Sequence, residues 1–480
     1  MRRCISTSTA PACWRMNSCS MEGFLTRRRF LKTTVTGAVG VLVAPVIVPS
    51  SVFGANAPGN RIHVGAIGCG RIARDHDMPC IMNAENARIM AVCDLDSKRL
   101  ADAKKFVCDH YTQKLGTPYN DVLTYGNHLE LLDNKDIDVV VISTPDHQHG
   151  KVTVDAVYAG KDVYLQKPLS LTVAEGRAIS NAVNSTGRIF QHGTQQRAMP
   201  QFRIATELIR NGRIGQLKTV EIRKSSDPSG GGDKEMPVPA NLNYDAWLGQ
   251  TPWVYYTEER VHPQDGYGRP GWLRCEQFGS GAITGNVIHH LDIAHWAMDT
   301  EYTGPIEISA QAEFPAPGSG LWNVHGKFST EMRYPNGVRM NCVEASPDKP
   351  DGLLFTGAEG WLFVAYGAYN ITASDPATIT SQKTLQASDP TILKWKPGPN
   401  DFQLDPTEEH HLNWLSCVRS RKQPLTNVEI AHRTTSACLL QHIAMKLPRK
   451  LYWDPIRERF KNDDEANAML SIVQRYPYNV

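Results

Sequence analysis

The stretch that decides the fold is residues 61–73, RIHVGAIGCGRIA. Its first seven residues are mostly apolar and predict a buried β-strand that runs directly into a helix. Gly68 permits the tight turn between them, Gly70 lets the backbone approach a pyrophosphate, and Ala73 is small enough for close helix–strand packing. Free N–H groups at the helix start favour a phosphate. The predicted dinucleotide-binding turn comprises Gly68, Cys69, Gly70, Arg71, Ile72 and Ala73.

A second apolar strand, residues 89–93, ends at an acidic residue, Asp94. A carboxylate at this position accepts hydrogen bonds from the adenosine ribose and repels a 2′-phosphate, so the spacing favours NAD. Lys98 and Arg99 follow closely, and cations there would suit the 2′-phosphate of NADP. They are equally well placed for an ordinary exposed helix start, so NADP stays as the alternative cofactor.

The alternation of strands and helices continues beyond residue 130. Residues 138–143 and 162–165 predict two continuous apolar strands, typical of a parallel sheet, with a helix at 152–159 between them. Ligands of open parallel sheets lie at the carboxyl ends of the strands. The candidate residues that follow these two strands are Thr144, Pro145, His147, His149, Gln166 and Lys167.

Everything after residue 60 resembles the Gfo/Idh/MocA oxidoreductases, the glucose-fructose oxidoreductase and inositol dehydrogenase group, in an exported bacterial branch. The resemblance rests on the glycine turn, Asp94, Thr144-Pro145-x-x-x-His149 and Gln166-Lys167-Pro168. The family's usual sequence at the last of these motifs is Glu-Lys-Pro. Gln166 replaces the glutamate, so Lys167 lacks a neighbouring carboxylate here. The residues that the resemblance assigns to the cofactor are Gly68, Gly70, Arg71, Ile72, Asp94, Thr144, Pro145, His149, Gln166 and Lys167.

A second family stretch falls on residues 281–292, GAITGNVIHHLD. His289 and Asp292 match the family's Asp-x-Gly-x-His-x-x-Asp pattern. The first Asp of that pattern falls on Gly285, so an acid usual in the inositol dehydrogenase branch is absent, and its glycine falls on Val287. His290 is a candidate replacement for the acid.

Oxidation of an alcohol needs a positioned hydride acceptor and a base for the hydroxyl proton. We expect Lys167 to bind the reacting hydroxyl beside the nicotinamide, where its charge favours the developing alkoxide. His289 is the expected base, since imidazole titrates near the working pH. A metal site is not expected, because only Asp292 accompanies His289, His290 and His295. Further candidates for a sugar pocket, each also explicable as structural, are Arg197, His262, Trp272, Arg274, His290 and Asp292.

The resemblance implies an α/β chain: a doubly wound parallel Rossmann sheet, then an α+β domain with an open, mostly antiparallel sheet. Alternating patterns predict strands for that second sheet at 216–223, 306–314, 326–334, 338–343, 353–356 and 361–364. Helices are predicted at 406–419 and 428–445. The expected divisions are a leader at 1–57, the Rossmann domain at 58–190, the second domain at 191–405, and helices at 406–480 that pack back on the Rossmann domain.

The N-terminal segment has the layout of an export signal. Residues 27–29 are arginines, residues 35–48 are apolar, and small residues follow at 54–57. The arginines resemble a twin-arginine signal, which predicts a periplasmic protein and a true start at Met21. The alternative is an uncleaved membrane anchor, although the apolar run is short for a bilayer span.

The composition excludes several classes of protein. Lys and Arg number 51 against 49 Asp and Glu, a net charge of +2, so nothing favours nucleic acid as a partner. Hydrophobic residues make 41% and charged residues 21% of the chain, as in ordinary globular proteins. Eight cysteines follow residue 57 without a Cys-x-x-Cys pair, so neither a zinc site nor a disulfide framework is expected.

Two functions follow from these features. The first is an NAD(P)-dependent oxidoreductase that acts on a sugar, cyclitol or derivative, as a homo-oligomer and without a stable membrane span. The alternative keeps the cofactor tightly bound and performs no net redox, cleaving glycosides or epimerising sugars through a transient keto intermediate. It arises because free nicotinamide cofactor is scarce outside the cytoplasm. A nucleotide-holding module without turnover is disfavoured by Lys167 and His289.

Overall fold

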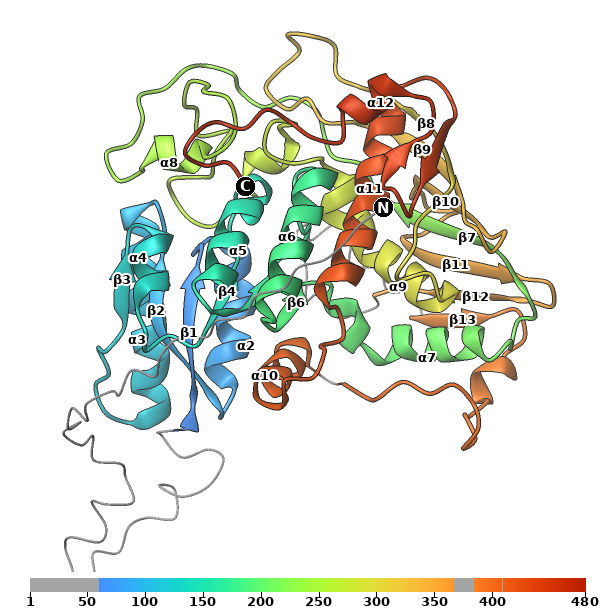
Figure 1. Cartoon of the computed structure of the whole chain (residues 1–480), viewed down its shortest axis with the longest axis horizontal. Helices are drawn as coiled ribbons and strands as arrows, with labels where there is room; N and C mark the ends of the chain where they lie inside the picture. Colours follow the sequence, from blue (N-terminus) through green and yellow to red (C-terminus); the bar gives the residue numbers. More distant parts are fainter. Residues whose placement is uncertain (1–59, 367–383, 408) are drawn as a thin grey trace, which may run out of the picture. The chain divides into compact units, whose positions relative to one another are not determined.

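The computed structural model describes residues 60–366, 384–407 and 409–480. The predicted leader and export signal, residues 1–57, lie outside these residues. Two β-sheets and the helices around them make up the described chain (Figure 1). None of the helices in the described ranges combines the length and apolar composition that a bilayer span requires.

The first sheet has six strands, and all of its pairings are parallel. The order β3-β2-β1-β4-β5-β6 is that of a doubly wound dinucleotide-binding fold, with its crossover between β1 and β4. The prediction of a Rossmann sheet is therefore confirmed. The strands are β1 (Ile62–Ile67), β2 (Ala87–Cys93), β3 (Leu123–Tyr125), β4 (Val139–Ile142), β5 (Asp162–Leu165) and β6 (Phe190–His192).

Both faces of this sheet are covered, which is why its strands are continuous apolar runs. In β4, Val139 and Val141 enter a core on one face, whereas Val140 and Ile142 enter a second core on the other. The covering helices are α2 (Met78–Asn83), which continues a π-helical turn at Ala73–Asp77, α3 (Ser97–Leu115), α4 (His128–Asp133), α5 (His149–Tyr158) and α6 (Val173–Thr186).

The second sheet has nine strands in the order β13-β12-β11-β7-β10-β9-β8-β14-β15. Only the β7–β10 pair is parallel, so the expected mostly antiparallel sheet is confirmed. Its strands are β7 (Leu217–Lys224), β8 (Glu307–Ala312), β9 (Phe328–Arg333), β10 (Arg339–Glu344), β11 (Gly352–Gly357), β12 (Trp361–Val364), β13 (Leu385–Ala387), β14 (Leu451–Asp454) and β15 (Arg459–Phe460).

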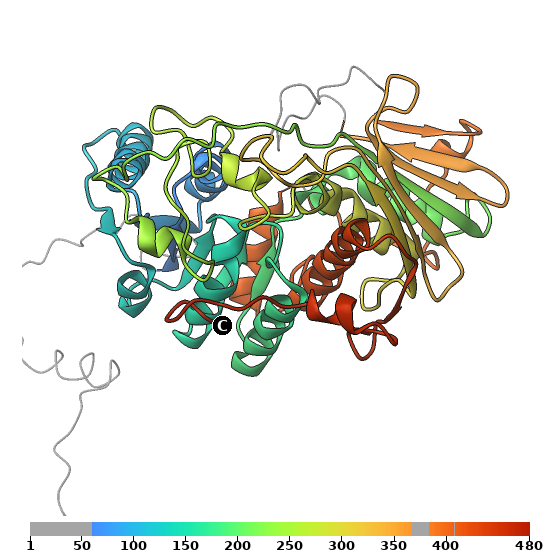
Figure 2. The ribbon, with the colours of Figure 1, turned by 90° about the horizontal axis from the view of Figure 1, so that it is seen from above.

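Three helices pack on one face of this second sheet (Figures 1 and 2). They are α7 (Pro200–Arg210), α9 (Ile288–Met298) and α11 (Val428–Lys446). Alternate residues of β9 are buried, as a strand with one covered face requires. Short helices at the edges of the structure are α8 (Tyr244–Leu248) and α12 (Asp464–Ala468).

The late helices join the two sheets. The first, α10 (His410–Ser420), contacts α2 and β5 of the parallel sheet. Near its start, α11 contributes Val428 and Ala431 to the core of the first sheet; further on, it contributes Ala437 and Leu440 to the core of the second. These two helices thus contact both sheets, while the expected domain divisions, with boundaries at residues 190 and 405, stay predictions.

Candidate functional site

A cavity of about 610 Å³ opens at the carboxyl ends of β1, β2, β4 and β5. Its volume is in the range of small-molecule and cofactor sites. Residues predicted from the sequence that line it are Gly68, Gly70, Arg71, Ile72, Asp94, Thr144, Pro145, Gln166, Lys167, His262 and Trp272. Lining residues that the sequence did not single out include Asp146, Trp247, Arg269, Asn286, Pro477 and Tyr478.

The glycine turn has the geometry that a pyrophosphate requires. Gly68 has φ +84°, and a Cβ on it would lie 2.8 Å from the backbone of Ser143, so only glycine fits. A Cβ on Gly70 would meet nothing within 4 Å, so the bare backbone faces open space in the cavity wall. Ala73 is buried against the sheet. The residues present therefore fit a dinucleotide at this turn.

Asp94 is held at the cavity by two backbone groups. Its Oδ2 accepts a hydrogen bond of 2.7 Å from the N–H of Cys69, and its Oδ1 accepts one of 2.9 Å from the N–H of Asp96. Each carboxylate oxygen keeps a further lone pair for a ribose hydroxyl. This arrangement supports the expected contact with the adenosine ribose.

The two cations after Asp94 are bound by a loop of the second half of the chain. The Lys98 ammonium donates to the carbonyl of Gln264 at 2.7 Å and pairs with Asp265 at 3.1 Å. The Arg99 guanidinium donates to the carbonyl of Pro263 at 2.9 Å. Both cations thus have partners on this loop, although Arg99 also lines the cavity; the carboxylate of Asp94 makes NAD the better fit.

Lys167 follows β5 and reaches the cavity wall. No hydrogen bond or ion pair joins its ammonium to any described residue, so the group is free to meet a ligand. Burial lowers the pKa of Lys167, the charge of Asp146 raises it in part, and the cations Arg269 and Arg71 lower it further. Burial likewise raises the pKa of Asp146. A lysine with a lowered pKa can exchange a proton near neutral pH.

Behind Lys167 lies a fully partnered polar network centred on Asp77, which is completely buried. Asp77 Oδ1 accepts a hydrogen bond of 2.8 Å from the Gln166 side chain, and Oδ2 accepts one of 2.7 Å from Ser143. Nε2 of His411 lies 3.1 Å from Oδ1. The glutamine at 166 is explained by this network, since glutamate would set two carboxylates against each other. Burial would raise the pKa of Asp77, but hydrogen bonds from His411 and His76 hold it below its usual value.

His149 does not line the cavity, contrary to its expected cofactor contact. It is fully buried, with Nδ1 2.6 Å from the carbonyl oxygen of Pro168 and Nε2 2.9 Å from that of Thr144. Burial lowers its pKa to about 4. The ring thus links the loops after β4 and β5 and positions Lys167. His147 is buried as well, 2.6 Å from the carbonyl oxygen of Trp247.

Two expected substrate residues form a buried ion pair instead. Arg197 binds the two carboxylate oxygens of Asp292 at 2.7 and 2.8 Å and also pairs with Glu301. Arg197 is 3% exposed and Asp292 1%, and neither lines the cavity. The expectation of a substrate role is corrected for both, because their charges neutralise each other inside the fold.

Arg274 is also absent from the cavity wall. Its guanidinium lies 3.5 Å from Asp227 and 4.5 Å from the ring centre of Trp322. The predicted sugar contact is therefore replaced by a packing and ion-pair role. His262 does line the cavity, and its Nε2 lies 3.0 Å from Asp96.

His289 and His290 begin α9, directly after a π-helical turn at Ile283–Val287. Neither lines the cavity, and their ring nitrogens have no hydrogen-bond partner among the described residues. Burial, followed by the charge of Lys167, lowers the pKa of His289 well below its usual value. His290 packs against Phe202 and Tyr366. The expected base is therefore neutral and lies outside the cavity wall.

The cavity contains open space where the family carries an aspartate. Gly285 lines the cavity, and a Cβ added there would meet nothing within 4 Å. His290 does not line the cavity, and its expected replacement of the acid stays a prediction. Asn286, the next residue along the π-helical turn, lines the cavity and was not predicted.

Further polar groups without partners lie between the two sheets, at His192, Thr194 and Gln196. All three are buried, and the charge of Lys167 contributes to the lowered pKa of His192, after burial and His149. Buried polar atoms normally have hydrogen-bond partners, so this region is suited to a polar ligand or ordered water. No function was assigned to these three residues from the sequence.

Two family models match this chain. "Oxidoreductase family, NAD-binding Rossmann fold" matches residues 62–194, and "Oxidoreductase family, C-terminal alpha/beta domain" matches residues 230–375 and 399–480. A glycosyl hydrolase family 109 protein of Shewanella pealeana is 32% identical over 164 residues, 32% of this chain and 35% of that protein. Inositol 2-dehydrogenase of Burkholderia cenocepacia is 26% identical over 256 residues, 53% of this chain.

The chain spans 58% of the length of that dehydrogenase, so the match is partial. Among solved structures, aldose-aldose oxidoreductase from Caulobacter crescentus, complexed with glycerol, has a TM-score of 0.55 at 20% identity. The alignment covers 82% of this chain and 99% of that one, and it shows a shared fold. With the glycine turn, the parallel sheet and the second sheet in place, the chain belongs to the Gfo/Idh/MocA oxidoreductase family, and its first half is an NAD-binding Rossmann domain.

Proposed function

We propose that this protein is an NAD-dependent oxidoreductase that moves a hydride between the nicotinamide and a CH–OH group of a sugar, cyclitol or derivative. The observation that carries the proposal is Lys167: its ammonium lies at the wall of the NAD cavity without a hydrogen-bond or ion-pair partner among the described residues. The name of the Burkholderia relative, an inositol 2-dehydrogenase, supports a polyol as the substrate class.

The described residues have distinct tasks in holding the cofactor. Gly68 and Gly70 leave room for the pyrophosphate, and Asp94 accepts hydrogen bonds from the adenosine ribose. Bound NAD supplies the hydride acceptor. The strand ends at Thr144 and Lys167 then face the reactive end of the nucleotide, since ligands of this fold lie along the carboxyl edge of the sheet.

Lys167 is the proposed catalytic residue. In the direction of oxidation, its neutral amine accepts the proton of the bound hydroxyl, and the resulting ammonium stabilises charge on the substrate oxygen. Asp146 tunes the proton affinity of Lys167 through its charge. We assign His289 a positioning role, because its ring is buried outside the cavity wall and is held neutral.

The polar groups without partners supply the proposed substrate contacts. A polyol presents several hydroxyls, each able to donate and accept, and such ligands suit neutral imidazole and amide side chains. His192 is a group of this kind beside Lys167, and Gln196 is a further buried amide without a partner among the described residues. Their desolvation has already occurred in the folded protein, so binding would recover hydrogen bonds rather than exchange them with water.

The test uses the purified chain with NAD and a panel of inositols, aldoses and their glycosides. We expect reduction of NAD with at least one polyol, and retention of NAD binding but loss of turnover in Lys167→Ala. Turnover of a glycoside or an epimer without net formation of NADH would instead support the non-redox alternative. Unchanged polyol oxidation in Lys167→Ala would reject the assigned role of Lys167.

We further propose export by the twin-arginine route, on the basis of residues 21–57 alone. Replacement of Arg27 and Arg28 by lysines should retain the protein in the cytoplasm, and fractionation of cells would measure this. An equal periplasmic yield would reject the route. Homo-oligomerisation also remains a proposal, to be measured by light scattering on the purified chain.

A further inference from the structure

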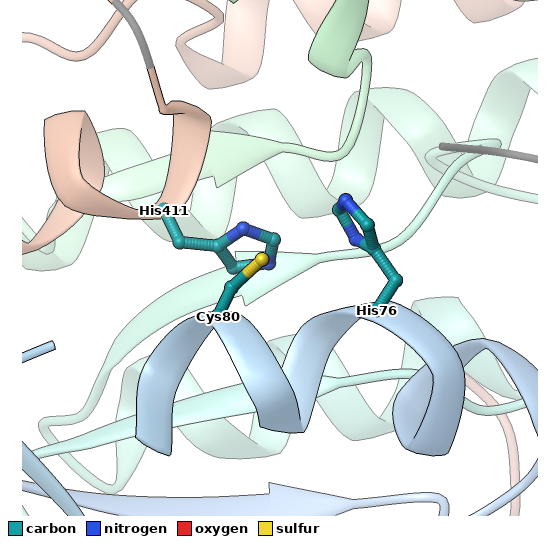
Figure 3. A group of neighbouring side chains, drawn as sticks. All are labelled: His76, Cys80 and His411. Carbon is teal, nitrogen blue, oxygen red and sulfur yellow. The ribbon is translucent and has the colours of Figure 1, made fainter. Parts of the chain in front are cut away.

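Three metal-ligating side chains meet where the start of α10 contacts the helical segment that ends in α2. His76 and Cys80 are four residues apart on the helical segment that ends in α2, and His411 lies in the first turn of α10. One donor atom from each, a nitrogen or the sulfur, lies within 4.8 Å of the others. Figure 3 shows the sulfur of Cys80 beside the ring of His411, with the ring of His76 facing both.

The neighbours of these side chains resemble the surroundings of a bound metal. Nδ1 of His411 lies 3.0 Å from the carboxylate of Glu409, the arrangement by which a carboxylate orients a ligating histidine. This contact directs Nε2 of His411 towards Asp77. Glu409 itself is fixed, because its side chain caps α10 by accepting from the backbone N–H of His411.

Asp77 adds a fourth donor at suitable spacing. Its Oδ1 lies 3.1 Å from Nε2 of His411 and 3.2 Å from Nδ1 of His76. In a tetrahedral zinc site with bonds of about 2.0–2.1 Å, neighbouring ligand atoms are about 3.3–3.4 Å apart. The Asp77 contacts are therefore close to the edges of such a tetrahedron. His76 and Cys80 are partly exposed, which leaves a path for an ion.

We propose that His76, Cys80 and His411, with Asp77, form a binding site for a divalent transition-metal ion of the zinc class. Two imidazoles and one thiolate favour zinc and its neighbours over magnesium or calcium, which prefer oxygen ligands. No Cys-x-x-Cys pattern marks this site, because its ligands come from segments more than 300 residues apart.

The site would have a structural task, with no redox step. It would join α2, in the first half of the chain, to α10, which belongs to the C-terminal segment. Asp77 also binds Gln166, the residue before Lys167. An ion here would thus fix the support of Lys167 without touching the substrate. The alternative is a metal-free network in which His76 and His411 only donate to Asp77.

The experiment is a titration of the metal-free full chain with Co²⁺, the spectroscopic substitute for zinc. We expect a thiolate-to-cobalt charge-transfer band and intense visible bands of tetrahedral Co²⁺, both removed by added zinc. Cys80→Ser should abolish the thiolate band. Glu409→Gln should keep the band but weaken zinc binding about 10- to 100-fold. The matched control is Cys108→Ser, on α3, which should behave as the wild type.

A second measurement does not depend on the folding of any variant. Alkylation of the wild-type chain, located by mass spectrometry, should be slowed at Cys80 by zinc and left unchanged at Cys108. The proposal is overturned if zinc leaves the alkylation rate of Cys80 unchanged, or if the cobalt spectrum lacks the thiolate band or retains it in Cys80→Ser. Either result would leave the metal-free network, and neither depends on the proposed oxidoreductase activity.

Discussion

The buried polar groups on the two sides of Lys167 differ in whether they have hydrogen-bond partners. On the side of the parallel sheet, Asp77 is fully buried and receives hydrogen bonds from Gln166, Ser143 and His411. Towards the second sheet, His192 and His289 are buried to a similar degree, yet neither ring has a hydrogen-bond partner among the described residues.

This difference distinguishes polar groups that stabilise the fold beside Lys167 from polar groups that are available to a ligand. A buried polar group without a partner costs about 1–3 kcal/mol, so a region that keeps several of them is less stable than it could be. Such groups can be explained if a ligand supplies the partners, whereas the Asp77 carboxylate already accepts hydrogen bonds from Gln166 and Ser143. The comparison therefore assigns the Asp77 network to the support of Lys167, and it assigns the unpartnered groups around His192 to the proposed substrate contacts.

The largest expected effect is that of Lys167→Ala, which removes the group between the two regions. We expect kcat for polyol oxidation to fall by ~10²–10⁴-fold, because proton transfer is lost, while NAD affinity and the unfolding free energy change little. Steady-state kinetics and fluorescence titration with NADH would measure both. Lys105→Ala, at an exposed lysine of α3, is the control and should leave kcat unchanged.

The substitution Gln166→Glu would disrupt the hydrogen-bond network around Asp77. The introduced carboxylate cannot donate to Asp77 and would face it inside the fold, so we expect the unfolding free energy to fall by about 1–3 kcal/mol. Urea unfolding would measure this, with Gln403→Glu, at an exposed glutamine, as the control. Equal stability of the two variants would show that the Asp77 network does not require an amide at residue 166.

Two histidines of α9 allow a direct test of the comparison. His295→Leu loses the 2.7 Å contact with the Tyr334 hydroxyl and should cost about 1–3 kcal/mol, because a buried partner is left unsatisfied. His289→Leu removes no hydrogen bond, so we expect its stability to stay within about 1 kcal/mol of the wild type or to rise, while kcat for polyol oxidation falls because a positioning group is lost. A large loss of stability in His289→Leu would contradict the comparison.

The smallest expected effect concerns pH. Oxidation requires the neutral amine of Lys167, so kcat/KM should rise as pH rises through the pKa of Lys167, which burial lowers. The charge of Asp146 raises that pKa, so Asp146→Asn should move the rising limb to lower pH, by about 1 unit. Asp109→Asn, at an exposed site on α3, serves as the control. A fall of kcat/KM as pH rises through this range would show that the ammonium form is the active one.

Local patterns were sufficient for much of the fold. Continuous apolar runs predicted β1, β4 and β5, and the glycine turn predicted the cavity beside Gly68 and Gly70, because both depend on backbone geometry within a few residues. Strand alternation likewise placed β9 and β10. The resemblance to the family then identified Lys167 as a candidate catalytic residue. Periodicity alone does not distinguish it from a surface lysine.

The sequence by itself determined the strands β1, β2, β4 and β5, the nucleotide turn and the acid at Asp94, because neighbours along the chain decide each of them. Tertiary structure decided which polar side chains face the cavity. Arg197 meets Asp292, 95 residues away, and Asp77 meets His411, 334 residues away. Burial and pairing between such distant residues decide whether a side chain is neutralised and whether it can contact a ligand. Arg197 and Lys167 were both candidate site residues in the sequence. In the structure, Arg197 forms an ion pair with Asp292, whereas the amine of Lys167 has no hydrogen-bond or ion-pair partner among the described residues.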